Sequence, residues 1–137
     1  MTGDDLHARV AAVNASAPFN AWAGFEVVAA EPGHVELRMT WRPEAAQYSG
    51  FLHAGLVGAL IDTVCGFAAF TQAGMVLASH YSVNCLAPAI GRAFVAHGHV
   101  VRAGRRQIFA RADLFAEDDV GARKLVATGE TILMTAD

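Results

Sequence analysis

One ionisable side chain interrupts the most apolar stretch of the sequence. Asp62 lies within the run 52–70, in which nearly every other residue is apolar or glycine. Burying a carboxylate without a partner is costly, so its presence needs a reason. Either hydroxyl groups such as those of Thr63 or Ser79 satisfy it, or it is kept for chemistry. A carboxylate in apolar surroundings can serve as a general base or a nucleophile.

The residues just before this run supply groups of a different kind. A polar loop containing Gln47 leads to His53, after which the pattern predicts a long helix over residues 54–72. The backbone N–H groups of Ala54 and Gly55 then lack intrahelical acceptors and lie at the positive end of the helix dipole, where they can stabilise a developing oxyanion. His53 either orients this loop or caps the helix. Gln47 either binds a carbonyl or a water molecule, or is a solvated loop residue.

The predicted helix is apolar nearly all round, which indicates a buried element. Its two sides differ in size. The bulky side chains share one side, at Leu56, Leu60, Phe67 and Phe70. Small residues and Asp62 form the other side, at Gly55, Gly58, Ala59, Cys65, Gly66 and Ala69. Another backbone or a ligand is therefore expected to pack closely against the small side.

The rest of the chain is expected to form a sheet around this helix. A short N-terminal helix over residues 4–17, within segment 1–18, ends at Pro18, and an aromatic loop with Phe19, Asn20 and Trp22 follows. Alternating apolar and polar residues, bounded by turn residues, predict strands at 25–30, 34–41, 75–86, 93–103, 107–116 and 124–134. Short turns indicate antiparallel order. A helix that is apolar all round needs a sheet that curls around it, which predicts one α+β domain over residues 1–137.

Composition excludes several classes of function. The 137 residues are 54% hydrophobic and only 17% charged, with a formal net charge of −3. A slightly negative net charge does not favour binding to nucleic acid or to anionic membranes. The high hydrophobic content suggests an oligomer interface. Asp62 and the glycines of the apolar run argue against a membrane span. Cys65 and Cys85 are expected to be buried free thiols, and a cytoplasmic location follows.

Two stretches carry a resemblance to a known family. The first combines Gln47, Gly50, the triplet His53-Ala54-Gly55, and an Asp nine residues after the His. The second is YSVNCLAPAIGRAFVAHGHVVRAGRR, residues 81–106. Over roughly residues 20–135 the chain resembles the hotdog-fold acyl-CoA thioesterases, in particular the phenylacetate-degradation (PaaI-like) group. Two positions depart from the family pattern, because the usual His-Gly-Gly is His-Ala-Gly and the loop amide, often Asn, is Gln47.

The resemblance implies a fold, a reaction and an assembly. The fold would be a long central helix wrapped by a curved antiparallel sheet. The reaction would be acyl-CoA hydrolysis, with Asp62 as nucleophile or general base facing Gln47 and the helix N-terminus, Ala54 and Gly55, of a second subunit. Alanine at position 54 still has a backbone N–H, so the donor of the family pattern is retained there. The protein would form a dimer or, as a dimer of dimers, a homotetramer, and would need no cofactor, since CoA belongs to the substrate.

Substrate contacts are expected at several further positions. In the family, a Ser or Thr helps to position water, and the resemblance places it near Ala78 or Ser79. Because Ala78 has no hydroxyl, Ser79 is the candidate for this role. Phe19, Trp22 and Tyr48 are candidates to line an acyl pocket, or are ordinary core aromatics. Cations cluster near predicted strand ends, at Arg92, Arg102, Arg105, Arg106 and Lys124. Arginine suits phosphate through its fork geometry, and the family places Gly-Arg turn residues there, so Gly104, Arg105 and Arg106 are candidates for the CoA phosphates, or are solvated turn residues.

Other functions remain open from the sequence. A hydroxyacyl-thioester dehydratase or hydratase would pair His53 with an acid, but the segments typical of those enzymes are not present. A hotdog domain that only binds acyl-CoA would tolerate loss of Asp62. His97 and His99 share one strand face without an evident third ligand, so no metal site is predicted.

Overall fold

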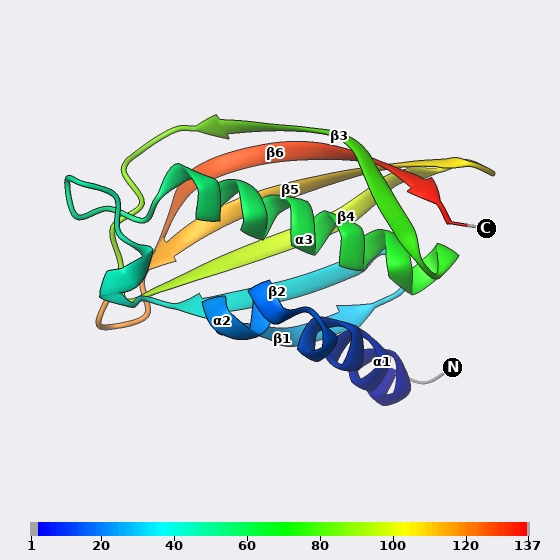
Figure 1. The fold of residues 1–137 in the computed structure, drawn as a ribbon, viewed down its shortest axis with the longest axis horizontal. Coiled ribbons are helices and arrows are strands. Elements are labelled where there is room, and N and C mark those ends of the chain that lie inside the picture. Colours follow the sequence, from blue (N-terminus) through cyan, green and yellow to red (C-terminus); the bar gives the residue numbers. More distant parts are fainter. Residues whose placement is uncertain (1–2, 137) are drawn as a thin grey trace.

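The computed structural model describes residues 3–136 and shows one long helix lying across a six-stranded antiparallel sheet (Figure 1). The strand order is β1-β2-β4-β5-β6-β3. The helices are α1 (Gly3–Ser16), α2 (Pro18–Ala23) and α3 (Ala54–Ala73), with a 3-10 turn at Pro43–Ala45. The strands are β1 (Phe25–Glu31), β2 (His34–Thr40), β3 (Val76–Cys85), β4 (Ala93–Ala103), β5 (Gln107–Glu117) and β6 (Arg123–Thr135). Residues 1, 2 and 137 of the expected domain lie outside the described residues.

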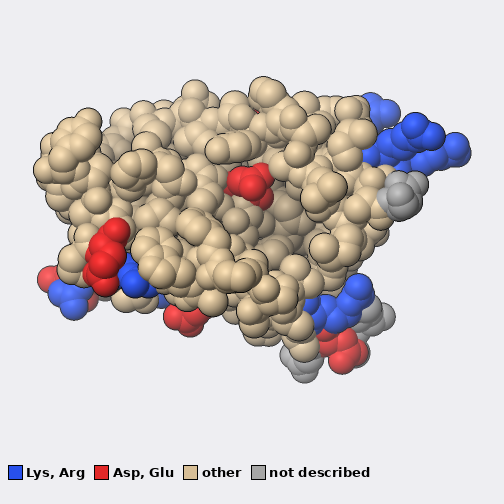
Figure 2. All heavy atoms as spheres, viewed as in Figure 1, with Lys and Arg blue, Asp and Glu red and all other residues tan. Residues whose placement is uncertain are grey.

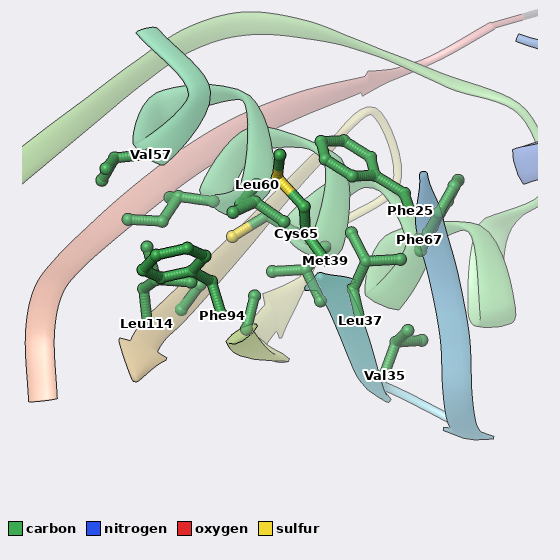
Figure 3. Close-up of a cluster of buried hydrophobic side chains, with 14 of the residues drawn as sticks. Phe25, Val35, Leu37, Met39, Val57, Leu60, Cys65, Phe67, Phe94 and Leu114 are labelled. Carbon is green, nitrogen blue, oxygen red and sulfur yellow. The ribbon is translucent and has the colours of Figure 1, made fainter. Parts of the chain in front are cut away.

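The curved sheet wraps around α3 and confirms the expected hotdog fold. Residues of β2 alternate as predicted, with Val35, Leu37 and Met39 buried against the helix and the intervening residues on the outer face. Figure 3 shows these three side chains in one buried cluster with Leu60 of α3 and Phe94 of β4. Each strand boundary predicted from the sequence is within two residues of the observed one.

Two strand glycines let the helix lie close to the sheet. A Cβ on Gly98 of β4 would be 2.7 Å from the carbonyl oxygen of Val64. A Cβ on Gly129 of β6 would be 2.6 Å from both Ile61 Cγ2 and the carbonyl oxygen of Ser82. Both distances are shorter than a carbon atom tolerates, so the closest approach depends on glycines of the sheet rather than on the small side of the helix.

The prediction that α3 is a buried element is confirmed for most of its residues, but the burial differs between its two sides. Its bulky side packs on the sheet, but Gly55 is exposed and Ala59, Asp62 and Gly66 are only partly covered. Tyr81 of β3 lies over part of the small side, near Gly58. By length and composition α3 is apolar enough to cross a membrane, yet most of its residues are buried inside the domain, as in the core helices of other folds.

The N-terminal region holds a second helix where the sequence predicted an aromatic loop. Pro18 ends α1 as expected, but it also occupies the first turn of α2, where its missing N–H costs nothing. Gly24 ends α2 with φ of 75°, a conformation that favours glycine. Pro18 therefore has two roles, because it follows the end of α1 and begins α2. The sequence pattern predicts only the first role.

The cysteines also differ from expectation in part. Both are free, and Cys65 is buried, but Cys85 at the end of β3 is exposed. Burial raises the pKa of the Cys65 thiol to about 12, while the neighbouring Thr131 opposes this rise. Cys65 therefore stays protonated at neutral pH and packs as a small apolar side chain.

We expect Gly98→Ala to lower the free energy of unfolding by about 1–3 kcal/mol, because the new methyl group must displace the α3 backbone. Gly66→Ala is the matched control. Its Cβ would meet only Leu133 Cδ2, at 3.7 Å, and the higher helix propensity of alanine should stabilise the fold by up to about 1 kcal/mol. Chemical denaturation measures both variants. Equal effects of the two substitutions would show that close packing at Gly98 does not limit stability.

Candidate active site

The Asp62 carboxylate lies in an apolar environment without a partner. Its Oδ1 atom is buried and accepts no hydrogen bond from the described residues. Burial raises the pKa of Asp62 above its ordinary value, because desolvation disfavours the charged form. An unpaired buried carboxylate oxygen is rare in folded proteins. It indicates a group that is kept for a ligand or a reaction rather than for stability.

The alternative in which hydroxyl groups satisfy Asp62 finds no support. Thr63 lines the same cavity, yet the buried Asp62 oxygen accepts no hydrogen bond. Ser79 is exposed, and its Oγ donates to the carbonyl oxygen of Ile132 at 3.3 Å. Of the two positions considered for a family hydroxyl, Ala78 lines the cavity and Ser79 does not.

Asp62 opens into a cavity of about 410 Å³ on the uncovered side of α3. α1, α2 and the beginning of β3 form its other walls. Apolar side chains dominate the lining, namely Val13, Ala17, Phe67, Phe70, Met75, Val76, Leu77, Ala78 and Leu133. Figure 2 shows this face of the molecule as almost free of charge, with an acidic group over α3 beside a hollow. The cavity can hold an apolar group next to the carboxylate.

The loop and helix start form a second cavity, of about 260 Å³. Gln47, Tyr48, His53 and Ala54 line it together with Cys85. The structure therefore brings four of the predicted site residues together, but it places them in a different cavity from Asp62. Gly55 is next to this group without lining the cavity.

Hydrogen bonds within this loop determine which of its polar atoms remain free to bind a substrate. His53 caps α3, because its Nδ1 accepts a hydrogen bond from the Gly55 N–H at 2.8 Å. The Gly55 donor is thus engaged, whereas the Ala54 N–H has no acceptor within the described chain. Gln47 Oε1 accepts from the Ser49 N–H. The Tyr48 side chain is fully exposed.

The two cavities cannot serve one small reacting group within a single chain. Asp62 follows Ala54 by eight residues along α3. At 1.5 Å per residue, these positions are separated by about 12 Å along the helix axis. A thioester carbonyl is far smaller than this separation. A site that combines the carboxylate with the helix N-terminus therefore requires a second copy of the chain.

The sheet has an uncovered edge beside the Asp62 cavity. β3 pairs with β6 on one side only and lies at the upper edge of the sheet in Figure 1. Its side chains from Leu77 to Ser82 are all exposed, including the apolar ones of Leu77 and Tyr81. The strand contains no Lys, Arg, Asp, Glu or Pro to protect it. Such an edge is suited to pairing with another strand.

The cations predicted to cluster lie at two separate ends of the sheet. Arg105 and Arg106 form the turn between β4 and β5, where they line a cavity of about 570 Å³ with Arg102 and Phe109. Arg92, by contrast, precedes β4 at the opposite end and contacts Asp119 at 3.3 Å. Lys124, near the start of β6, pairs with Ala116 at that same far end. The cations thus lie near strand ends as predicted, but at opposite ends of the sheet, because the whole length of β4 separates Arg92 from Arg105.

The histidines share the outer face of the sheet as predicted. The ring of His34 lies 6.2 Å from that of His97 and 6.4 Å from that of His99. His97 also contacts Glu36 at 3.5 Å. Over residues 3–136 no group of three His, Cys, Asp or Glu side chains is placed to hold a metal ion.

One lining residue was missed by the sequence reasoning. Asn20 of α2 reaches the Asp62 cavity, whereas its aromatic neighbours Phe19 and Trp22, which were candidates for an acyl pocket, do not line it. Trp22 instead contacts the guanidinium of Arg42, 4.8 Å from its ring centroid. The lining positions Val13, Ser16, Ala17 and Asn20 follow helical spacing. This spacing is the sequence signal that points to Asn20 as a lining residue. Pro18 obscures it, because a proline in a helical pattern usually predicts the end of the helix.

Comparison with known proteins agrees with this geometry. A family model described as Thioesterase superfamily matches residues 49–122, more than half of the chain. A thioesterase family protein from Silicibacter pomeroyi is 36% identical, and its structure superposes with a TM-score of 0.89 over 94% of this chain and 96% of that one. No curated protein matches the chain.

More distant structures share the fold. Zebrafish thioesterase superfamily member 2 is 24% identical, with a TM-score of 0.82 over 99% of both chains. The E. coli PaaI protein from the phenylacetic acid degradation operon is 18% identical, with a TM-score of 0.81 over 96% of both chains.

The matched family segment contains His53, Ala54, Gly55 and Asp62, and it ends beyond the arginine turn. The resemblance to hotdog thioesterases is thereby confirmed, and it supports thioester hydrolysis as the general chemistry. The chain belongs to the thioesterase superfamily.

Proposed function

We propose that this protein hydrolyses acyl-CoA thioesters to a free acid and CoA, with Asp62 as the nucleophile or general base. The observation that carries the proposal is the Asp62 carboxylate, which lies beside an apolar cavity with a buried oxygen that no described residue satisfies. The cavity suits an acyl group, and the carboxylate then lies next to the thioester carbon.

The reaction requires that a water oxygen bond to the acyl carbon while the carbon–sulfur bond breaks. Asp62 either takes a proton from this water or first attacks the carbon itself and is released by water afterwards. The departing thiolate receives a proton and leaves as CoA. Negative charge develops on the carbonyl oxygen during the attack, and the free Ala54 N–H at the start of α3 is a suitable donor for it. No cofactor is needed in this scheme.

A second copy of the chain completes the proposed site. The axial separation between Asp62 and Ala54 excludes cooperation within one chain, and the uncovered β3 edge next to the Asp62 cavity offers a place for pairing. In the proposed dimer, the helix N-terminus and Gln47 of one copy face Asp62 of the other. We propose a homodimer or a dimer of dimers, located in the cytoplasm, where free thiols such as Cys65 and Cys85 persist.

The polar end of the substrate is assigned to the arginine turn. Arg105 and Arg106 are exposed next to Gly104, and the described residues give neither side chain an ion-pair partner. They are thus available for the phosphate groups of CoA. Tyr48, exposed beside the helix start, is assigned to the substrate as well. Ser79 is assigned to the substrate by the resemblance alone, since its Oγ donates to the carbonyl oxygen of Ile132 and the residue does not line the cavity.

The geometry disfavours a hydratase. Such a reaction would pair His53 with an acid across the site, but the Nδ1 atom of His53 is already engaged, because it accepts a hydrogen bond from the Gly55 N–H. A domain that only binds acyl-CoA would not need the carboxylate, whose burial is unfavourable.

Asp62→Asn is expected to lower kcat/KM for acyl-CoA hydrolysis by about 10²–10⁴-fold, the usual contribution of a catalytic acid or base. Release of free CoA thiol from short, long and aryl acyl-CoA measures this. In the wild type, hydrolysis should fall as the pH is lowered through the raised pKa of Asp62, because the protonated carboxyl can neither attack nor accept a proton. Wild-type turnover by the Asn variant would rule out the assignment.

The same variant should be more stable than the wild type at neutral pH. The folded-state pKa of Asp62 is raised, so its ionised form lowers the free energy of unfolding above that pKa. The advantage of Asn should vanish below about pH 3.9, where Asp is protonated in both states. Asp119→Asn, in an exposed ion pair with Arg92, should show little effect. A destabilised Asp62→Asn would mean that the carboxylate contributes to the fold.

The two-copy site predicts complementation between inactive variants. Asp62→Asn and Gln47→Ala should each be impaired alone. Co-expressed with different affinity tags, they form mixed dimers that hold one intact site, so random pairing restores about a quarter of the wild-type activity. If the purified mixed dimer is as inactive as its parents, Asp62 and Gln47 do not act across an interface.

Arg105→Ala combined with Arg106→Ala should raise KM for acyl-CoA by about 3–30-fold and leave kcat nearly unchanged, because the arginines bind phosphate equally in the ground and transition states. Arg92→Ala is the control, an exposed arginine at the opposite end of the sheet. An effect on kcat alone, or an equal effect of the control, would contradict the assignment.

A further inference from the structure

Asn20 places an amide in the wall of the apolar Asp62 cavity. The residue lies on α2, is only 9% exposed and lines the cavity opposite α3. A buried amide in apolar surroundings needs hydrogen-bond partners. The partners of Asn20 therefore decide whether it is part of the structure alone or also serves a ligand.

The hydrogen-bond network fixes which atoms of Asn20 are free. Asn14 Nδ2 donates to the carbonyl oxygen of Phe25 at 2.7 Å. Asn14 Oδ1 therefore faces Asn20 and accepts from its Nδ2 at 3.1 Å. This arrangement orients the Asn20 amide and uses one of its two N–H groups.

The Oδ1 atom and the second N–H of Asn20 remain without a partner within the described chain. Oδ1 is not sealed inside protein, because among the described side chains the buried unsatisfied atoms are Asp62 Oδ1 and Thr131 Oγ1. The free acceptor of Asn20 therefore keeps access to open space, and the cavity is the open space that this residue lines. One acceptor and one donor side by side suit a hydroxyl group, which both donates and accepts.

We infer that Asn20 determines specificity by binding a hydroxyl group on the acyl chain, remote from the thioester. The inference rests on the proposed function, in which Asp62 on the α3 wall acts at the thioester carbon. An acyl chain that extends from Asp62 toward α2 brings its far end to Asn20, through apolar side chains such as Phe67 and Val13. A substrate without the hydroxyl leaves the amide unpaired in the cavity, and this lowers its kcat/KM.

The test compares straight-chain acyl-CoA with ω-hydroxyacyl-CoA of the same length, from butyryl to decanoyl. At the length that reaches Asn20, the wild type should favour the hydroxylated partner. Asn20→Leu should shift the ratio of the two kcat/KM values toward the plain chain by about 3- to 10-fold, the effect of one neutral hydrogen bond.

Ser16→Ala is the matched control. Ser16 also lines the cavity from the side of α1, but its Oγ donates to the carbonyl oxygen of Val13 at 2.7 Å, and it takes no part in the Asn14–Asn20 hydrogen bond. The substrate ratio should therefore stay within about twofold of the wild type, less than one hydrogen bond.

An equal shift in both variants, or no preference at any length in the wild type, overturns the inference while hydrolysis itself stands. If the wild type cleaves no thioester, the proposed function fails, and the inference fails with it.

Discussion

The close contact between one helix and a curled sheet determines the rest of this structure. Gly98 and Gly129 allow α3 to approach the strands closely, and the bulky side of the helix is therefore buried in the core. A helix embedded this deeply has only one side left. That side carries small residues and Asp62, and it is open because the sheet curls behind the helix without closing over it. The arrangement produces a rigid apolar floor with a single carboxylate.

Much of this could be predicted from the sequence. The long apolar run identified α3, and strict alternation identified the strands, because periodicity records which side chains face the core. What the sequence left open has physical reasons. Apolar composition predicts that α3 is mostly buried, but it does not distinguish a face covered by the chain's own sheet from one that the sheet leaves open. Likewise, Arg92 and Arg105 are near in sequence, but they lie at opposite ends of the sheet because the 11 residues of β4 run between them.

The candidate site was predictable in its parts and not in its arrangement. The unusual position of Asp62 is visible in the sequence, and so are the donors that follow His53. Their assignment to separate cavities depends on the rise per residue along α3 and on the position of β3, which only the structure provides. Asn20 was hidden for a local reason, since a proline that ends one helix and begins the next looks like a loop.

The bare edge of β3 has a consequence for the life of the chain before assembly. A newly folded copy presents an open row of backbone donors and acceptors beside a face with few charged groups. The same surface that would recruit the correct partner is equally open to the edge strands of unrelated chains. If the proposed dimer forms, a protomer that has not yet found its partner would be more prone to aggregation than the assembled protein. Translation of several chains from one messenger RNA would then bring partners together sooner and favour a high yield of native protein.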